Sequence, residues 1–128
     1  MKGQSRPPPS RRIVAVVDDD PALRSSLQFF LEVDGYEVRT FGDATELLGD
    51  PGMAHFACII IDQDPPASNG IELFQRLRDE AVLAPVILLT SRPSELLLQR
   101  ARKAGVPIVE KPLLDNALAD RIQSLLKC

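Results

Sequence analysis

The sequence has little of several patterns that mark particular classes of protein. It contains two cysteines, Cys58 inside an apolar run and Cys128 at the last position, which make neither a disulfide framework nor a zinc pattern. No apolar run approaches the roughly 20 residues of a membrane-spanning helix, and the first residues lack the apolar core of a signal peptide. These absences favour a cytoplasmic protein with no membrane partner.

An excess of positive charge is also missing. The net charge is -3 at pH 7, which argues against non-specific binding to nucleic acid or to anionic membranes. Residues 1–11 differ from the rest because they are basic, proline-rich and without periodicity, so they are predicted to form a disordered arm. The remaining residues, 12–128, are enough for one domain with a single core.

Apolar runs typical of buried strands alternate with segments of helical periodicity along this domain. The predicted strands are 13–17, 36–41, 56–61, 85–89 and 106–109, and the predicted helices are 21–34, 43–48, 71–79, 94–104 and 114–126. Alternation of this kind predicts the α/β class, in which helices cover both faces of a parallel sheet. Right-handed crossovers make that fold a doubly wound one.

Some details of the helices follow from residue types. Asp20 before Pro21 is a good N-cap and first-turn pair for the 21–34 helix. The apolar face of this helix is predicted to hold Leu23, Leu27, Phe30 and Leu31. The run of leucines at 96–98 is longer than one buried helix face needs, so at least one of them is expected to face outward and to mark a dimer or target surface.

Polar residues follow the ends of four predicted strands. Asp18 and Asp19 follow the first strand, Asp62 the third, Thr90 the fourth and Lys111 the fifth. The carboxyl ends of parallel strands lie at one edge of the sheet, where ligands bind. Adjacent carboxylates at the end of a buried strand destabilise each other unless a cation lies between them, and Mg²⁺ prefers such oxygen ligands.

Together these residues are suited to phosphoryl transfer. Asp62 is the candidate nucleophile, which would carry the phosphoryl group as an acyl phosphate. Thr90 can donate a hydrogen bond to one phosphoryl oxygen, and Lys111 can pair with another. Taken singly, each residue could have a purely structural role, as a turn cap, a strand end or a surface charge. Their occurrence together favours a phosphoryl-transfer site.

Four segments, in this order and at this spacing, make the sequence resemble the response-regulator receiver family, the phosphoacceptor domain of two-component signalling. They are VVDDDP at 16–21, IIIDQDPPASNG at 59–70, ILLTS at 87–91 and EKP at 110–112. The resemblance covers residues 13–126 and implies the flavodoxin-like strand order 2-1-3-4-5.

The roles of the family's residues carry over by position. Asp62 matches the phosphorylated aspartate, and Asp18 and Asp19 match the acidic pair that holds Mg²⁺. The backbone carbonyl of Asp64 matches a further metal ligand. Thr90 and Lys111 match the switch hydroxyl and the lysine of the family.

The sequence departs from the family pattern at several positions. Pro65 stands where the family usually has methionine, which predicts a stiffer loop, and the bond before Pro112 is a candidate cis peptide. Ile108 stands where the family usually has a switch tyrosine or phenylalanine, so a changed output mechanism is predicted. The Asp64 side chain is expected to point to solvent, or alternatively to raise metal affinity. Arg92 is expected to face Asp64 and to prolong the phosphoryl lifetime.

The chain ends within a few residues of the last predicted helix, with no helix-turn-helix or catalytic output domain, so a single-domain regulator without a DNA-binding output domain is expected. It is not expected to be an enzyme, because self-phosphorylation and dephosphorylation would be its only chemistry. Expected partners are a sensor histidine kinase and either a downstream target protein or a phosphotransfer protein. A homodimer through the 94–104 helix, the 106–109 strand and the 114–126 helix is a further possibility. Two alternatives stay open: a degenerate receiver that binds partners without phosphorylation, and a small phosphohydrolase with Asp62 as nucleophile, since Asp62 and Asp64 form a D-x-D pattern.

Overall fold

The structure is a computed structural model that describes residues 12–64, 70–111 and 117–126. The predictions made for the 1–11 arm, for the loop at Pro65 and for the bond before Pro112 fall outside these residues.

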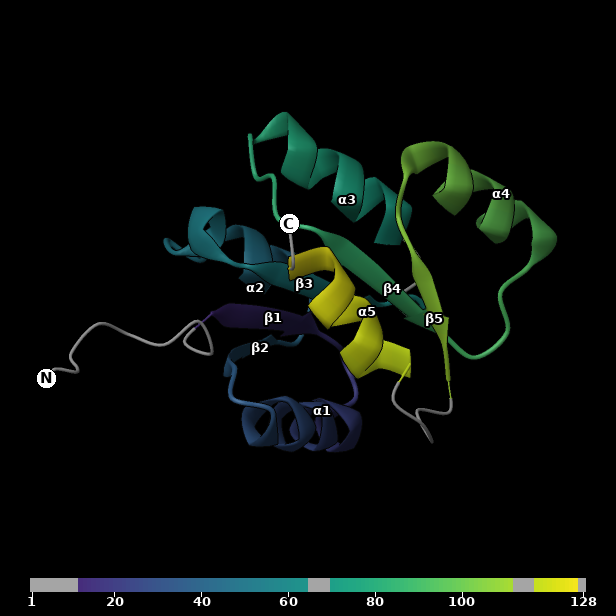
Figure 1. Ribbon diagram of the computed structural model, residues 1–128. Helices are drawn as coiled ribbons and strands as arrows, with labels where there is room; N and C mark the ends of the chain where they lie inside the picture. The colour runs from purple at the N-terminus through teal and green to yellow at the C-terminus, as the bar shows by residue number, and fades with distance from the viewer. Residues whose placement is uncertain (1–11, 65–69, 112–116, 127–128) are drawn as a thin grey trace, which may run out of the picture.

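Five parallel strands form one sheet in the order β2-β1-β3-β4-β5 (Figure 1). The strands are β1 (Ile13–Val17), β2 (Glu37–Phe41), β3 (Cys58–Asp62), β4 (Val86–Thr90) and β5 (Ile108–Glu110). Every residue of β3 and of β4 is buried, as expected for parallel strands covered on both faces. The predicted fold class and strand order are therefore confirmed.

Helices cover both faces of the sheet (Figure 1). On one side, α1 (Pro21–Val33) and α5 (Ala117–Leu126) pack on strand residues such as Val16 and Ile60. On the other side, α2 (Ala44–Leu48), α3 (Gly70–Asp79) and α4 (Glu95–Ala104) pack on residues such as Ala15 and Ile59. A short 3₁₀ turn, Met53–His55, precedes β3. None of the helices in the described ranges is long and apolar enough to cross a bilayer.

Several ends differ from the predicted ones by one or two residues, as the ends of such elements usually do. The third strand begins at Cys58 instead of Phe56, and the fifth runs from Ile108 to Glu110 instead of 106–109. The fourth helix begins at Glu95 because Ser94 is its N-cap, whose side chain accepts from the Leu97 N–H at 3.0 Å. The predicted start of the last helix at 114 lies outside the described residues.

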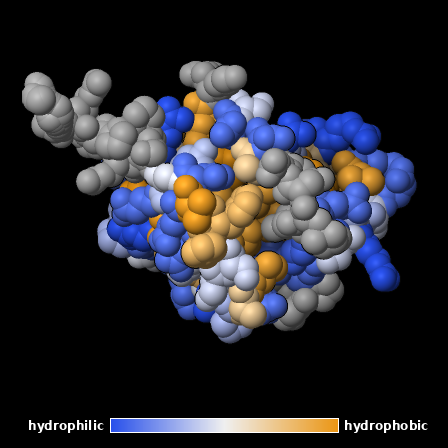
Figure 2. Space-filling model, turned by 60° about the horizontal axis from the view of Figure 1, so that its bottom comes forward, coloured by the Kyte–Doolittle hydropathy of each residue, from blue (hydrophilic) through white to orange (hydrophobic). Residues whose placement is uncertain are grey.

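The sequence predicted a wider buried face on α1 than the structure has. Leu27 and Leu31 are buried, but Phe30 is 37% exposed, because it lies at the edge of a narrow stripe set by the i, i+4 pair. Phe29 and Val33 are 70% and 69% exposed, and Figure 2, which looks from the α1 side, shows apolar residues gathered among charged ones. In α4, Leu96 is 64% exposed, so the prediction of an outward leucine is confirmed.

Gly70, the first residue of α3, gives a test of the packing beside the carboxyl edge of the sheet. Its N–H donates to Gln63 Oε1 at 2.8 Å, and a Cβ there would overlap Gln63 Oε1 and lie 2.8 Å from Leu88 Cδ2. Gly70→Ala should therefore lower the free energy of unfolding by about 1–3 kcal/mol in urea denaturation.

Gly49→Ala is the matched control, because a Cβ at that position has its nearest neighbour, the Thr45 carbonyl oxygen, at 3.4 Å. Its stability should stay within about 0.5 kcal/mol of wild type. Equal stability of the two variants would contradict this packing.

Candidate functional site

The residues predicted at the strand ends lie together at one edge of the sheet. Asp18 follows β1, Asp62 ends β3, Thr90 ends β4 and Lys111 follows β5. Asp18, Asp62 and Thr90 are 1%, 6% and 3% exposed, and they are the buried polar or charged residues within the described part of the chain. Polar groups are rarely buried unless they are paired or functional, so this edge is the candidate site.

Three carboxylates form a cluster at this edge. One oxygen from each of Asp18, Asp19 and Asp62 lies within 4.8 Å of the others. The Asp18 Oδ1 atom accepts a hydrogen bond from the Asp20 N–H at 2.9 Å, whereas its Oδ2 atom is buried without a hydrogen-bond partner. Burial, together with the neighbouring Asp62 carboxylate, raises the pKa of Asp18 to about 6.

This cluster of carboxylates is suited to binding Mg²⁺. Oxygen ligands from two or more carboxylates suit a hard divalent cation, and the unpartnered Asp18 Oδ2 is a buried acceptor that a cation would satisfy. Asp19 is exposed, which leaves one side of the cluster open to water. Asp20 has a structural role, as predicted, because its side chain caps α1 by accepting from the Ala22 N–H at 3.0 Å.

Lys111 compensates the acidic edge. Its ammonium group lies 2.8 Å from Asp62 Oδ1 and 3.1 Å from Asp64 Oδ2. Burial alone would lower the pKa of Lys111, but the hydrogen bonds and charges of these two carboxylates outweigh it and raise the pKa. The Lys111 N–H also donates to the Thr90 carbonyl at 2.9 Å, which fixes the backbone of Lys111 relative to β4.

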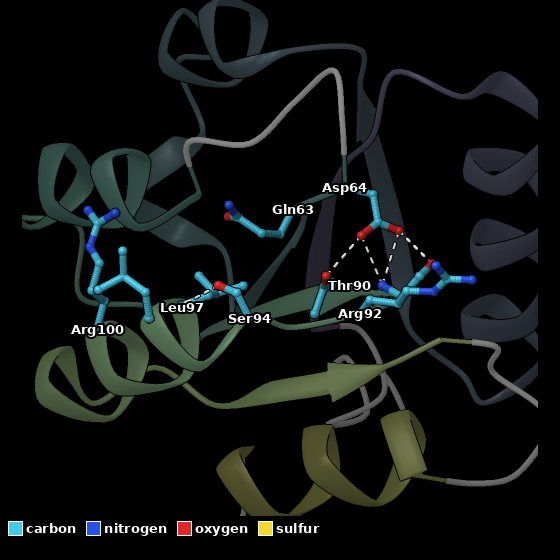
Figure 3. A pocket seen from close by; sticks show the side chains of 9 residues that line it. Gln63, Asp64, Thr90, Arg92, Ser94, Leu97 and Arg100 are labelled. Carbon is cyan, nitrogen blue, oxygen red and sulfur yellow. Dashed lines mark hydrogen bonds between the residues drawn. The ribbon is translucent and has the colours of Figure 1, made fainter.

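The Asp64 side chain does not point to solvent, contrary to the expectation from the sequence. Its carboxylate accepts from Thr90 Oγ1 at 2.9 Å, from the Ser91 N–H at 2.9 Å and from Ser91 Oγ at 2.7 Å (Figure 3). Although partial burial raises the pKa of Asp64, hydrogen bonds from Ser91, Thr90 and Lys111 outweigh it and hold the pKa at about 2.

Two further residues near this carboxylate differ from the sequence analysis. The expected Arg92–Asp64 pair is absent from the ion pairs of the described residues, because Asp64 turns toward Thr90, Ser91 and Lys111 instead. Ser91 was missed, although its place directly after the strand-end Thr90 puts a second hydroxyl at the same edge.

A cavity of about 510 Å³ opens beside Asp64, between the end of β4 and helix α4. Its lining includes Gln63, Arg92 and Arg100 (Figure 3). Arg100 is already engaged, since its Nη2 atom lies 3.0 Å from Glu72 Oε2 of α3.

Ile108, the residue at the position of the family's switch aromatic, lies in β5 opposite Leu88. It is partly buried and packs against the core of the α2, α3 and α4 side.

The sequence model of the response regulator receiver domain matches residues 14–123. The chain belongs to this family. Membership favours a signalling module over the phosphohydrolase that the D-x-D pattern of Asp62 and Asp64 also suggested.

The receiver is similar to known transcriptional regulators over most of its length. It is 35% identical over 116 residues to the transcriptional regulatory protein FixJ of Bradyrhizobium diazoefficiens, covering 89% of this chain and 56% of that protein. It is 36% identical over 110 residues to the C4-dicarboxylate transport transcriptional regulatory protein DctR of Rhodobacter capsulatus, covering 84% and 56%. The receiver thus spans just over half the length of these relatives.

Solved structures are similar as well. The chemotaxis protein CheY4 of Vibrio cholerae matches with a TM-score of 0.81 and 28% identity, over 91% of the receiver and 99% of that chain. The structure named FixJ-N matches with a TM-score of 0.78 and 28% identity, over 91% and 94%.

The raised pKa of Asp18 makes a prediction about stability. The pKa rises from 3.8 to about 6 on folding, so the folded receiver binds a proton that the unfolded chain releases at lower pH. Without metal, wild type should lose stability as the pH rises from about 4 to about 6. Asp18→Asn should not, and near pH 7 in EDTA it should be about 1–3 kcal/mol more stable than wild type in urea denaturation.

Mg²⁺ should reverse this order, because it stabilises only a receiver that can bind it. Excess Mg²⁺ should raise the stability of wild type and leave Asp18→Asn unchanged. Glu37→Gln, which removes an exposed carboxylate on β2, is the control and should behave as wild type. A wild-type stability that is independent of both pH and Mg²⁺ would contradict the assignment of Asp18.

Proposed function

We propose that the receiver accepts a phosphoryl group on the carboxylate of Asp62 from the phosphohistidine of a sensor histidine kinase. The observation that carries this proposal is the place of Asp62, which is 6% exposed at the end of β3, hydrogen-bonded to Lys111 at 2.8 Å and clustered with Asp18 and Asp19. A carboxylate in such surroundings is shielded from bulk water and compensated by a cation, as a nucleophile for phosphoryl transfer requires.

In the proposed reaction an Asp62 oxygen attacks the phosphorus atom as the P–N bond of the phosphohistidine breaks. The electron pair of that bond returns to the imidazole, which leaves as a neutral ring when its other nitrogen carries a proton. The product is an acyl phosphate on Asp62 with about two negative charges. The receiver itself supplies the nucleophile and the positions of the charges around it.

Each neighbour of Asp62 has a role in this proposal. Lys111 holds the Asp62 carboxylate in place through their 2.8 Å contact, and its ammonium group can then pair with a phosphoryl oxygen. The Thr90 hydroxyl can donate to a second phosphoryl oxygen. Asp18, Asp19 and Asp62, with the backbone carbonyl of Asp64, would hold Mg²⁺. When bound, Mg²⁺ supplies positive charge that offsets the charge of the phosphoryl group.

The output of the receiver is proposed to be contact with a target protein or transfer of the phosphoryl group to a phosphotransfer protein. Helix α4, strand β5 and helix α5 stay the predicted surface for a homodimer, and Leu96 of α4 is a large exposed apolar residue on it. A cytoplasmic location also stays a prediction, as does the absence of nucleic acid as a direct partner of this domain.

The acceptor is tested by mass spectrometry of the intact receiver after incubation with acetyl phosphate and Mg²⁺. Wild type should gain about 80 Da, the mass of HPO₃, and Asp62→Asn should gain nothing because an amide oxygen is a poor nucleophile.

Asp79→Asn, at the exposed end of α3, is the matched control and should be modified as wild type is. An adduct that persists on Asp62→Asn would place the acceptor elsewhere. A wild type that binds Mg²⁺ and takes no phosphoryl group would favour the degenerate receiver instead.

A further inference from the structure

The donors around Asp64 form a compact anion-binding group. Thr90 Oγ1, the Ser91 N–H and Ser91 Oγ donate to its carboxylate at 2.9, 2.9 and 2.7 Å, and the Lys111 ammonium lies 3.1 Å away. We call these three residues, Thr90, Ser91 and Lys111, the donor set. A carboxylate with four donors is held firmly, because hydrogen bonds to a charged acceptor are among the stronger ones.

One member of the donor set, Lys111, also contacts Asp62. The same Lys111 ammonium lies 2.8 Å from Asp62 Oδ1, and the Asp64 N–H donates to that oxygen at 3.2 Å. A phosphoryl group on Asp62 would bring three acceptor oxygens and about two negative charges into this space. Its natural partners there are the Thr90 hydroxyl and the Lys111 ammonium, and both are bound by Asp64 before phosphorylation.

We propose that the Asp64 carboxylate is an internal competitor of the phosphoryl group, which occupies the donor set and must leave it when Asp62 is phosphorylated. This inference rests on the proposed function of Asp62. Two anions cannot share these few donors without strong repulsion. The occupied donor set therefore slows phosphorylation, and the phosphoryl group in turn expels the Asp64 side chain.

The structure offers room for the expelled side chain. Asp64 lines the cavity of about 510 Å³ between the end of β4 and α4, and its side chain is 22% exposed. It can thus rotate away from the donor set without unpacking the core. Arg92 lines the same cavity, is exposed and has no ion pair within the described residues (Figure 3). Since Arg100 is already paired with Glu72, Arg92 is the cavity arginine with which we expect the released carboxylate to pair.

The test compares the rates at which acetyl phosphate and Mg²⁺ modify wild type, Asp64→Asn and Asp64→Ala, followed by intact mass spectrometry. Both variants should be modified about tenfold faster than wild type, the effect expected for loss of about one charge-assisted hydrogen bond from the competitor. Asp64→Ala should be at least as fast as Asp64→Asn, since an amide oxygen can still accept from Ser91.

Glu110→Gln is the charge-matched control. Glu110 is exposed and precedes Lys111, and its side chain is absent from the hydrogen bonds of the donor set. Removing this negative charge should change the rate by less than about twofold, which separates competition for the donor set from a general attraction of the acetyl phosphate anion.

A second readout does not depend on phosphorylation. In ¹H–¹⁵N NMR spectra the Ser91 amide proton should lie downfield in wild type, because it donates to a carboxylate, and should move upfield in Asp64→Ala. The Ser91 amide of Glu110→Gln should keep the wild-type position. Addition of acetyl phosphate and Mg²⁺ to wild type should then move the Ser91 amide, because the phosphoryl group displaces the Asp64 carboxylate.

The outcomes separate the two proposals. If all variants are modified on Asp62 at the wild-type rate, Asp64 is not a competitor and Asp62 remains the acceptor. If the Ser91 amide does not move in Asp64→Ala, the proposed role of Asp64 is wrong, whatever the result for Asp62. If Asp64→Asn and Asp64→Ala are modified on Asp62 about tenfold faster than wild type, while Glu110→Gln keeps the wild-type rate, both proposals are supported. If neither wild type nor any variant is modified although Mg²⁺ binds, both the proposed phosphorylation of Asp62 and the proposed competition by Asp64 are wrong.

Discussion

The site depends on negative charge that the fold places in a poorly hydrated position. β1 and β3 are neighbours in the sheet, with Val17 opposite Ile61, so the residues that come after Val17 and after Ile61 must lie side by side. These residues are Asp18 and Asp62, which are 1% and 6% exposed. Like charges held so close destabilise the folded state unless cations compensate them. Within the described residues, Lys111 is the cation that pairs with Asp62, and the open side of the acidic cluster leaves a place for a metal ion.

Most of this arrangement could be predicted from the sequence, since it depends on where strands end. Buried parallel strands read as continuous apolar runs, and their carboxyl ends lie at one edge, so Asp18, Asp62, Thr90 and Lys111 were expected together. The direction of the Asp64 side chain could not be predicted, because it depends on which side-chain donors at the ends of β4 and β5 come within hydrogen-bond distance of it. The exposure of Phe30 was missed for a related reason: helical periodicity gives the direction of a buried face but not its width.

Two departures from the family pattern bear on how a signal would leave the site. Ile108 has no aromatic ring that could move between a buried and an exposed position. Its branched aliphatic side chain packs against the core. The contacts of Asp64 instead join the end of β3 to the end of β4, at 2.9 Å to Thr90 and 2.7 Å to Ser91 Oγ. Movement of Asp64 would alter the cavity beside α4 and its arginines. Under the proposed competition, Asp64, two residues after Asp62, would therefore report phosphorylation in place of an aromatic residue in β5.

The most direct test of Asp62 as a Mg²⁺-dependent acceptor is chemical trapping of the acyl phosphate. Borohydride reduces a phosphorylated aspartate to homoserine, so peptide sequencing by mass spectrometry after treatment with acetyl phosphate identifies the modified residue. The predicted result is homoserine at position 62 when Mg²⁺ is present and none when EDTA replaces it. Homoserine at Asp18, Asp19 or Asp64, or equal trapping at Asp62 in EDTA, would contradict the account.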